Sequence, residues 1–200
     1  MNRYDPIEHR YWIGELEVPS VTRLLPKKDF NMPAERLEMY RQLGIEQHEL
    51  IKMYFQTVYP NRYEGKNRML MALDRFVEKD AYKLGNLVCC ERPLFSEEYL
   101  FAGTPDNVFE NGIIDWKRSR VTKKDMALQH AGYDILAFEN CFYRPVKRQW
   151  IMAWYDNFID EFKSSEVYRP DAIETFLLHV TDYYLHNKIN EYHARSNNGN

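Results

Sequence analysis

The segment over residues 87–118 constrains the fold most, because it is a series of short β-type runs enclosed by helical sequence. Turn residues separate the runs, which cover residues 87–95, 99–103, 107–110 and 112–118. Glu110-Asn111-Gly112 between the last two runs is typical of a β-hairpin. The order predicts a strand meander that packs between helices.

Apolar residues recur at helical spacing on both sides of this meander, and they predict helices over residues 34–59, 67–84, 125–139 and 171–192. A strand is predicted over 149–154, and alternation predicts a last strand over 158–162. Near the start, residues 11–18 are typical of a hairpin that turns at Gly14, and Ser20 is a candidate N-cap for a short helix. The sequence therefore predicts an α/β fold, a sandwich around a small mixed sheet.

Length and composition exclude several classes of protein. The 200 residues fit one domain with a single core, and the polar end over 196–200 is expected to be disordered. No apolar run is long enough to span a bilayer, and the first residues lack the apolar stretch of a signal peptide, so we expect a cytoplasmic protein without a membrane partner. Three cysteines without CxxC spacing exclude a disulfide framework and an iron–sulfur cluster.

The net charge of −3 gives no general attraction to nucleic acid, but the cations are unevenly distributed. Five of them fall within eight residues, namely Lys117, Arg118, Arg120, Lys123 and Lys124. Such a run is either a solvated surface or a contact for a polyanion such as DNA.

Two acids stand in the central hairpin, directly before this basic run. Asp106 begins one predicted strand, and Asp115 lies in its partner, where alternation puts Asp115 and Lys117 on one face and Trp116 on the other. Neighbouring carboxylates in a partly buried site repel each other, and a divalent cation compensates them efficiently. An adjacent lysine can hold water or neutralise charge on a phosphate. The arrangement suits metal-assisted phosphodiester hydrolysis, although charged hairpins also occur on ordinary surfaces.

Pro105-Asp106 and Asp115-Trp116-Lys117 match the signature of the PD-(D/E)XK nuclease superfamily, which the chain resembles over residues 11–154. Four further elements match in order, at residues 18–22 (VPSVT), 44–49 (GIEQHE), 91–94 (ERPL) and 129–133 (QHAGY). They are most similar to the RecB-type branch that includes the mitochondrial genome maintenance exonuclease and its phage and bacterial relatives.

The resemblance implies a single nuclease domain with a restriction-endonuclease-like core, acting in a bacterial or phage-infected cell. It also implies Mg²⁺ or Mn²⁺ held by His48, Asp106, Asp115 and the Trp116 carbonyl. Lys117 would position water, with Glu91 as a further acid beside the metal. Gln129 would support the site, and DNA would contact Ser20, Thr22, Tyr133 and the basic residues Arg118, Arg120, Lys123 and Lys124. The implied activity is exonucleolytic, on single-stranded DNA ends or flaps.

Other interpretations remain open for several of these residues. His48 has the position of a core histidine, Glu91 the position of a salt-bridge partner for an arginine, and Ser20 and Thr22 suit a helix cap. Four aromatics either stack bases or belong to the core, namely Tyr54, Phe55, Tyr59 and Tyr63. The rival functions are a structure-specific endonuclease of the same superfamily and an inactive nuclease fold that binds DNA or protein.

Overall fold

The computed structural model describes residues 1–26, 33–118, 123–140 and 148–197, with side chains left out for 123–125 and 188–197. Its centre is a five-stranded sheet in the order β10-β9-β8-β7-β4. The strands are β4 (Leu87–Cys90), β7 (Asn107–Phe109), β8 (Gly112–Lys117), β9 (Gln149–Asp156) and β10 (Glu161–Glu166). Strands β8 and β9 are parallel and the other pairs antiparallel, so the predicted mixed sheet is confirmed.

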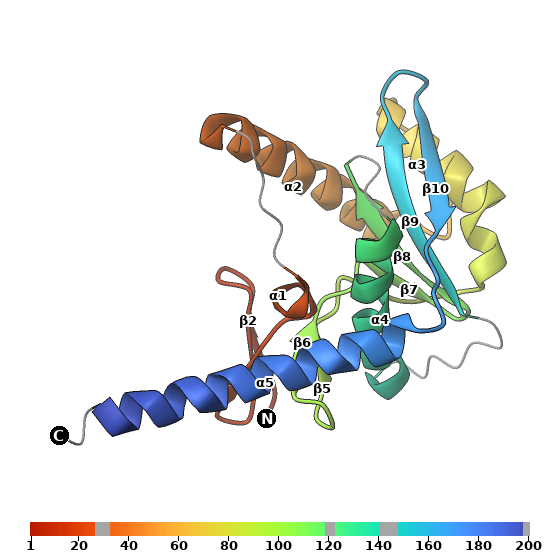
Figure 1. Cartoon of the computed structure of the whole chain (residues 1–200). Coiled ribbons are helices and arrows are strands. Elements are labelled where there is room, and N and C mark those ends of the chain that lie inside the picture. The colour runs from red at the N-terminus through yellow and green to blue at the C-terminus, as the bar shows by residue number, and fades with distance from the viewer. Residues whose placement is uncertain (27–32, 119–122, 141–147, 198–200) are drawn as a thin grey trace.

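Helices cover both faces of this sheet (Figure 1). On one face lie α2 (Ala34–Thr57) and α3 (Arg68–Lys79), and on the other lie α4 (Lys123–Asn140) and α5 (Ala172–Asn197). Alternation along β8 divides its side chains between two cores, because Ile114 and Trp116 pack with α2 and α3 while Ile113 packs with α4 and α5. The predicted α/β sandwich is therefore correct.

Smaller elements lie beside the sandwich. An antiparallel sheet contains β1 (Arg3–Asp5), β2 (Arg10–Ile13) and β3 (Leu16–Val18), of which only the β2–β3 hairpin was expected from the sequence. Ser20 caps the short helix α1 (Val21–Leu24), as predicted, by accepting a hydrogen bond from the Arg23 N–H. A second pair, β5 (Leu94–Ser96) and β6 (Phe101–Gly103), follows the one-turn 3₁₀ helix η1 (Ala81–Leu84) and β4, and a bridge from Ser20 to Ala102 connects it to α1.

Three sequence expectations need correction. The run over 87–95 is two strands in different sheets, because Glu91 takes a left-handed backbone conformation (φ 43°) and the chain bends before Leu94. The strand expected over 158–162 begins only at Glu161, since Asp156 accepts the Phe158 N–H in a tight turn and leaves Phe158 almost fully exposed. Residues 196 and 197 belong to α5, and 198–200 lie outside the described residues.

The aromatic residues at the end of α2 and just after it pack in the core. Tyr54 and Phe55 are buried, and Tyr59 and Tyr63 pack against the same core, so the core interpretation of these four aromatics is correct.

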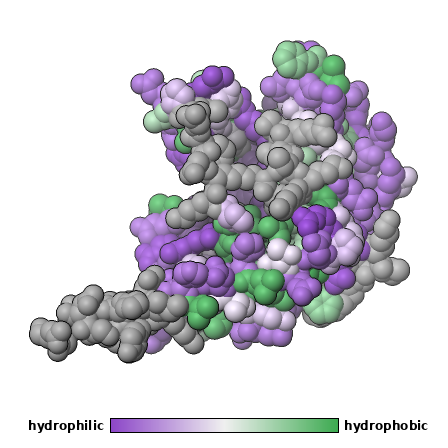
Figure 2. All heavy atoms as spheres, in the orientation of Figure 1, coloured by the Kyte–Doolittle hydropathy of each residue, from purple (hydrophilic) through white to green (hydrophobic). Residues whose placement is uncertain are grey.

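Hydrophilic residues cover most of the face in Figure 2, with apolar residues in small separate groups. Of the helices that the structure describes, none is both long enough and apolar enough to cross a membrane.

Two helical glycines give opposite predictions for stability. A Cβ at Gly132 in α4 would lie 2.7 Å from the Phe176 ring and 2.9 Å from Val21, whereas a Cβ at Gly44 in α2 would meet nothing within 4 Å. We expect Gly132→Ala to lower the free energy of unfolding by about 1–3 kcal/mol through overpacking. Gly44→Ala should raise it by about 0.5–1 kcal/mol through helix propensity. Urea denaturation measures both, and equal stability of the two variants would contradict the packing of α4 against α1 and α5.

Candidate metal centre

The hairpin of β7 and β8 brings the two predicted acids together. The register pairs Asn107 with Ile114, which leaves Asp106, just before β7, beside Asp115 in β8. The Trp116 backbone N–H donates to Asp106 Oδ2 at 2.7 Å. Within a strand the N–H and C=O of one residue point to the same side, so the Trp116 carbonyl also faces Asp106.

Asp115 is almost completely buried and is held by side chains from two elements. Its Oδ1 atom accepts a hydrogen bond of 2.9 Å from Gln129 in α4, and its Oδ2 atom lies 2.7 Å from the Lys117 ammonium. The amide therefore binds one carboxylate oxygen and the ammonium pairs with the other. A buried carboxylate with a single cation partner and a second acid beside it fits a site that takes up a further cation.

His48 and Glu91 reach Asp106 from other parts of the chain. The His48 Nδ1 atom lies 3.7 Å from Asp106 Oδ1, and the side chain is one-third exposed, so His48 is not a buried core histidine. The Glu91 N–H donates to the Asp106 carbonyl oxygen at 2.9 Å. The partner of the Glu91 carboxylate is Lys52 in α2, at 3.2 Å, rather than an arginine.

Three of these side chains could hold one ion. His48, Glu91 and Asp106 each offer a ligand atom, and these atoms lie within 4.8 Å of one another. Asp115 is outside this group, so among the described residues the cluster differs from the expected ligand set of His48, Asp106 and Asp115. Glu91, expected as a further acid beside the metal, belongs to the cluster.

The electrostatics of the site also favour a cation. Burial, and then the charge of Asp115, raise the pKa of Asp106 to about 7. Burial lowers the pKa of Lys117, but the attraction of Asp115 and Asp106 outweighs it, so this pKa lies above its ordinary value. One ammonium thus faces two carboxylates, and a divalent ion would complete the compensation.

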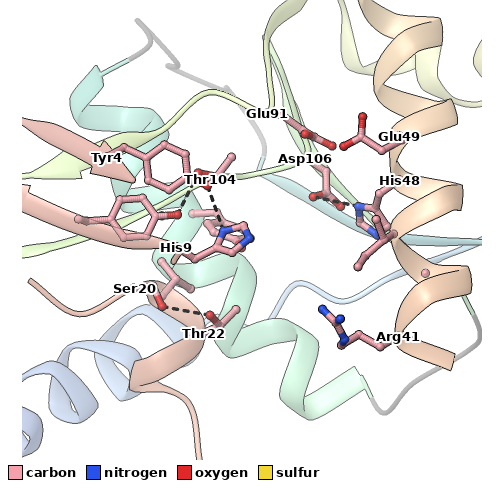
Figure 3. Close-up of a pocket in the computed structure, with 16 residues that line it drawn as sticks. Tyr4, His9, Ser20, Thr22, Arg41, His48, Glu49, Glu91, Thr104 and Asp106 are labelled. Carbon is pink, nitrogen blue, oxygen red and sulfur yellow. Dashed lines mark hydrogen bonds and ion pairs between the residues drawn. The ribbon is translucent and has the colours of Figure 1, made fainter. Parts of the chain in front are cut away.

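A cleft of about 740 Å³ opens beside the cluster, with His48, Glu91 and Asp106 on its wall. Ser20, Thr22 and Tyr133, predicted to contact DNA, also line it. Gln129 does not line it but donates to the Tyr133 hydroxyl at 3.2 Å, which links the cleft wall to Asp115. Figure 3 shows the two sides of the cleft, with His48 and Asp106 facing Ser20 and Thr22.

The cleft also contains residues that sequence reasoning missed, namely Tyr4, His9, Tyr11, Arg41 and Thr104. Thr104 directly precedes the Pro105-Asp106 motif and could have been suggested by it. The N-terminal residues and Arg41 carry no local signal, because only the tertiary fold brings them here.

The predicted basic run is only partly described. Arg118 does not line the cleft, and its guanidinium stacks 4.4 Å from the centre of the Tyr40 ring in α2. Arg120 and the side chains of Lys123 and Lys124 lie outside the described residues.

The chain matches no protein-family model and no curated protein sequence. Several solved structures are similar to it, two of them of one exonuclease. An alkaline exonuclease from Laribacter hongkongensis is 14% identical, with 88% of this chain and 89% of that chain covered and a TM-score of 0.47. The same exonuclease in complex with dAMP is 15% identical, with 83% and 87% covered and a TM-score of 0.38. Likenesses at this level carry no argument about function. Any inference about function therefore depends on the site itself.

The raised pKa of Asp106 predicts a pH-dependent cost to the metal-free fold. The folded-state pKa of about 7 exceeds the ordinary 3.8, so the folded protein binds more protons between these pH values. The free energy of unfolding therefore falls as the pH rises through this window. At pH values above the window the full destabilisation by the charged Asp106 remains. Asp106→Asn removes the cost, and in EDTA its melting temperature should exceed that of the wild type by about 5 °C at about pH 8, and by less at about pH 5.

Asp156→Asn is the matched control for this effect. Asp156 is a partly exposed acid at the end of β9, and its pKa is lowered first by its hydrogen bond with Lys163 and then by the Phe158 N–H. Its replacement should give no stabilisation at high pH. An Asp106→Asn protein that melts below the wild type at about pH 8 would show that Asp106 is a stabilising charge instead.

Proposed function

We propose that this protein is a metal-dependent deoxyribonuclease, a single-domain exonuclease that acts on single-stranded DNA ends or flaps in DNA processing, recombination or repair. The observation that carries the proposal is the meeting of His48, Glu91 and Asp106 beside Asp115 and Lys117. These residues come from separate segments of the chain, and each falls on a motif of the PD-(D/E)XK pattern.

The donor set fits Mg²⁺ or Mn²⁺. Asp106, His48 and the Trp116 carbonyl would hold the ion, together with Asp115 or Glu91, both of which lie beside Asp106. Oxygen donors suit either ion, and the imidazole favours Mn²⁺. When bound, such an ion makes water a competent nucleophile near neutral pH and stabilises charge on phosphate.

The protein's own side chains would perform the remaining tasks. The Lys117 ammonium, held at Asp115, would orient the attacking water and neutralise charge that develops on the phosphate. Gln129 would keep Asp115 in position through its hydrogen bond at Oδ1. Ser20 and Thr22, whose hydroxyl groups lie 3.1 Å apart at the cleft, would bind a substrate phosphate.

Loss of the central charges should abolish hydrolysis with little effect on folding. We expect Asp115→Asn and Lys117→Ala each to reduce cleavage of single-stranded DNA in Mg²⁺ by at least about a hundredfold, because they remove charge from the reacting centre. Both proteins should retain the circular dichroism spectrum of the wild type. Near-native activity of either variant would mean that the reaction takes place elsewhere.

The form of the DNA substrate separates the proposal from its rivals. An exonuclease degrades linear single-stranded DNA and leaves a circular single strand intact, whereas an endonuclease cuts both. An inactive binding module cuts neither in Mg²⁺ or Mn²⁺ but still binds DNA or a protein. End-labelled linear and circular DNA, incubated with each metal, distinguish these outcomes.

Metal binding by itself tests the assignment of His48. We expect His48→Ala to weaken Mn²⁺ binding by about tenfold or more in isothermal titration calorimetry. Protons compete with the metal for Asp106, so the Mn²⁺ affinity of both proteins should fall as the pH is lowered through about 7, the pKa of that carboxyl. His186→Ala is the matched control, since His186 is an exposed residue of α5 beside Asp182. Equal Mn²⁺ affinity of wild type and His48→Ala would exclude His48 as a ligand.

A further inference from the structure

His9 is held in an unusual position on the wall of the cleft. It lies in the connection between β1 and β2, takes a left-handed backbone conformation (φ 50°), and is exposed. Left-handed residues other than glycine are uncommon and often mark functional positions. Figure 3 shows its ring projecting into the cleft, with Ser20 and Thr22 on one side and Asp106 and His48 beyond it.

A hydrogen bond to Tyr4 fixes the His9 ring. The Tyr4 hydroxyl lies 3.0 Å from His9 Nδ1. When the hydroxyl donates to Nδ1, the imidazole hydrogen is on Nε2, and that atom makes no hydrogen bond within the described part of the chain. The ring then offers a free N–H donor to the cleft. An anion can accept a hydrogen bond from this N–H, and it favours the ring forms that carry a hydrogen on Nε2.

Tyr4 is in turn anchored in the small N-terminal sheet. Its ring stacks on that of Tyr11, with centroids 4.7 Å apart and an angle of 27°. Tyr11 is buried, and its hydroxyl lies 3.0 Å from Thr104 Oγ1, two residues before Asp106. The aromatic pair therefore connects the sheet to the segment that carries Asp106.

We propose that His9 and Tyr4 form a nucleotide-binding subsite on the cleft wall that faces the metal centre. His9 Nε2 donates to a backbone phosphate of single-stranded DNA, and the partly exposed Tyr4 ring contacts the adjoining base. The pairing of a phosphate donor with an aromatic ring is the usual way in which proteins hold single strands without sequence preference. This inference rests on the proposed nuclease function and adds a substrate-holding role for the N-terminal sheet.

The variant His9→Asn tests the subsite with little risk to the fold, because asparagine tolerates the left-handed conformation. Its side chain is too short to place a donor where His9 Nε2 lies. The probe is fluorescein-labelled oligothymidylate, titrated in Ca²⁺ and followed by fluorescence anisotropy. We expect about tenfold weaker binding than in the wild type, with Mn²⁺ affinity unchanged. Ile7→Asn is the matched control, since Ile7 lies in the same connection, is exposed and does not line the cleft, and it should bind as the wild type does.

Tyr4→Phe supplies a second variant that keeps the ring stack and removes only the hydroxyl that orients His9. It should weaken binding by a smaller factor, about threefold, because His9 keeps its position less often. Wild-type binding by both His9→Asn and Tyr4→Phe, in a protein that cleaves DNA in Mg²⁺, would overturn the subsite alone. Failure of the wild type to bind or cleave DNA in Mg²⁺ or Mn²⁺ would overturn the nuclease function, and the subsite with it.

Discussion

Two carboxylates, Asp106 and Asp115, lie side by side at the end of the β7–β8 hairpin, and their mutual repulsion in a buried place sets the requirement that the surrounding structure meets. Three contacts compensate part of it. The Trp116 N–H binds Asp106, Gln129 binds Asp115, and the Lys117 ammonium lies against Asp115 Oδ2. The compensation is incomplete, because burial and Asp115 still raise the pKa of Asp106 to about 7. A divalent cation would complete the compensation.

The sandwich explains how distant segments reach this point. Helix α2 crosses one face of the sheet and supplies His48 and Lys52, while Glu91 follows β4 at the sheet edge and hydrogen-bonds to Asp106 through its backbone. Helix α4 packs on the opposite face and supplies Gln129 and Tyr133, which reach Asp115 and the cleft. The N-terminal sheet and α1 form the wall across from α2 (Figure 3). The cleft therefore combines acidic groups on one side with hydroxyl and aromatic groups on the other, a distribution suited to a metal-bound phosphodiester.

Sequence reasoning predicted what local patterns determine. Alternation in β8 correctly separated Asp115 and Lys117 from Trp116, and Ser20 was correctly identified as a cap. Features that depend on tertiary contacts could not be predicted in this way. The pairing of Glu91 with Lys52, and the arrival of Tyr4 and His9 at the cleft, depend on packing between segments far apart in the sequence. The break at Glu91 was missed because the apolar residues at 87–90 and at 94–95 were read as one continuous strand. The turn at Phe158 was missed because the residues of a turn that begins at Asp156 alternate in the same way as those of a strand.

The central claim is that the cluster around Asp106 binds a divalent cation, and the most direct measurement is the anomalous scattering of Mn²⁺ in crystals of the protein. We expect one strong anomalous peak within bonding distance of Asp106 and His48, with Asp115, Glu91 or the Trp116 carbonyl completing the ligands. The peak should disappear in crystals soaked with EDTA. A well-ordered site without a peak at saturating Mn²⁺, or Mn²⁺ bound only at other acidic groups, would contradict the account and would leave Asp106 and Asp115 as a structural charge cluster paired with Lys117.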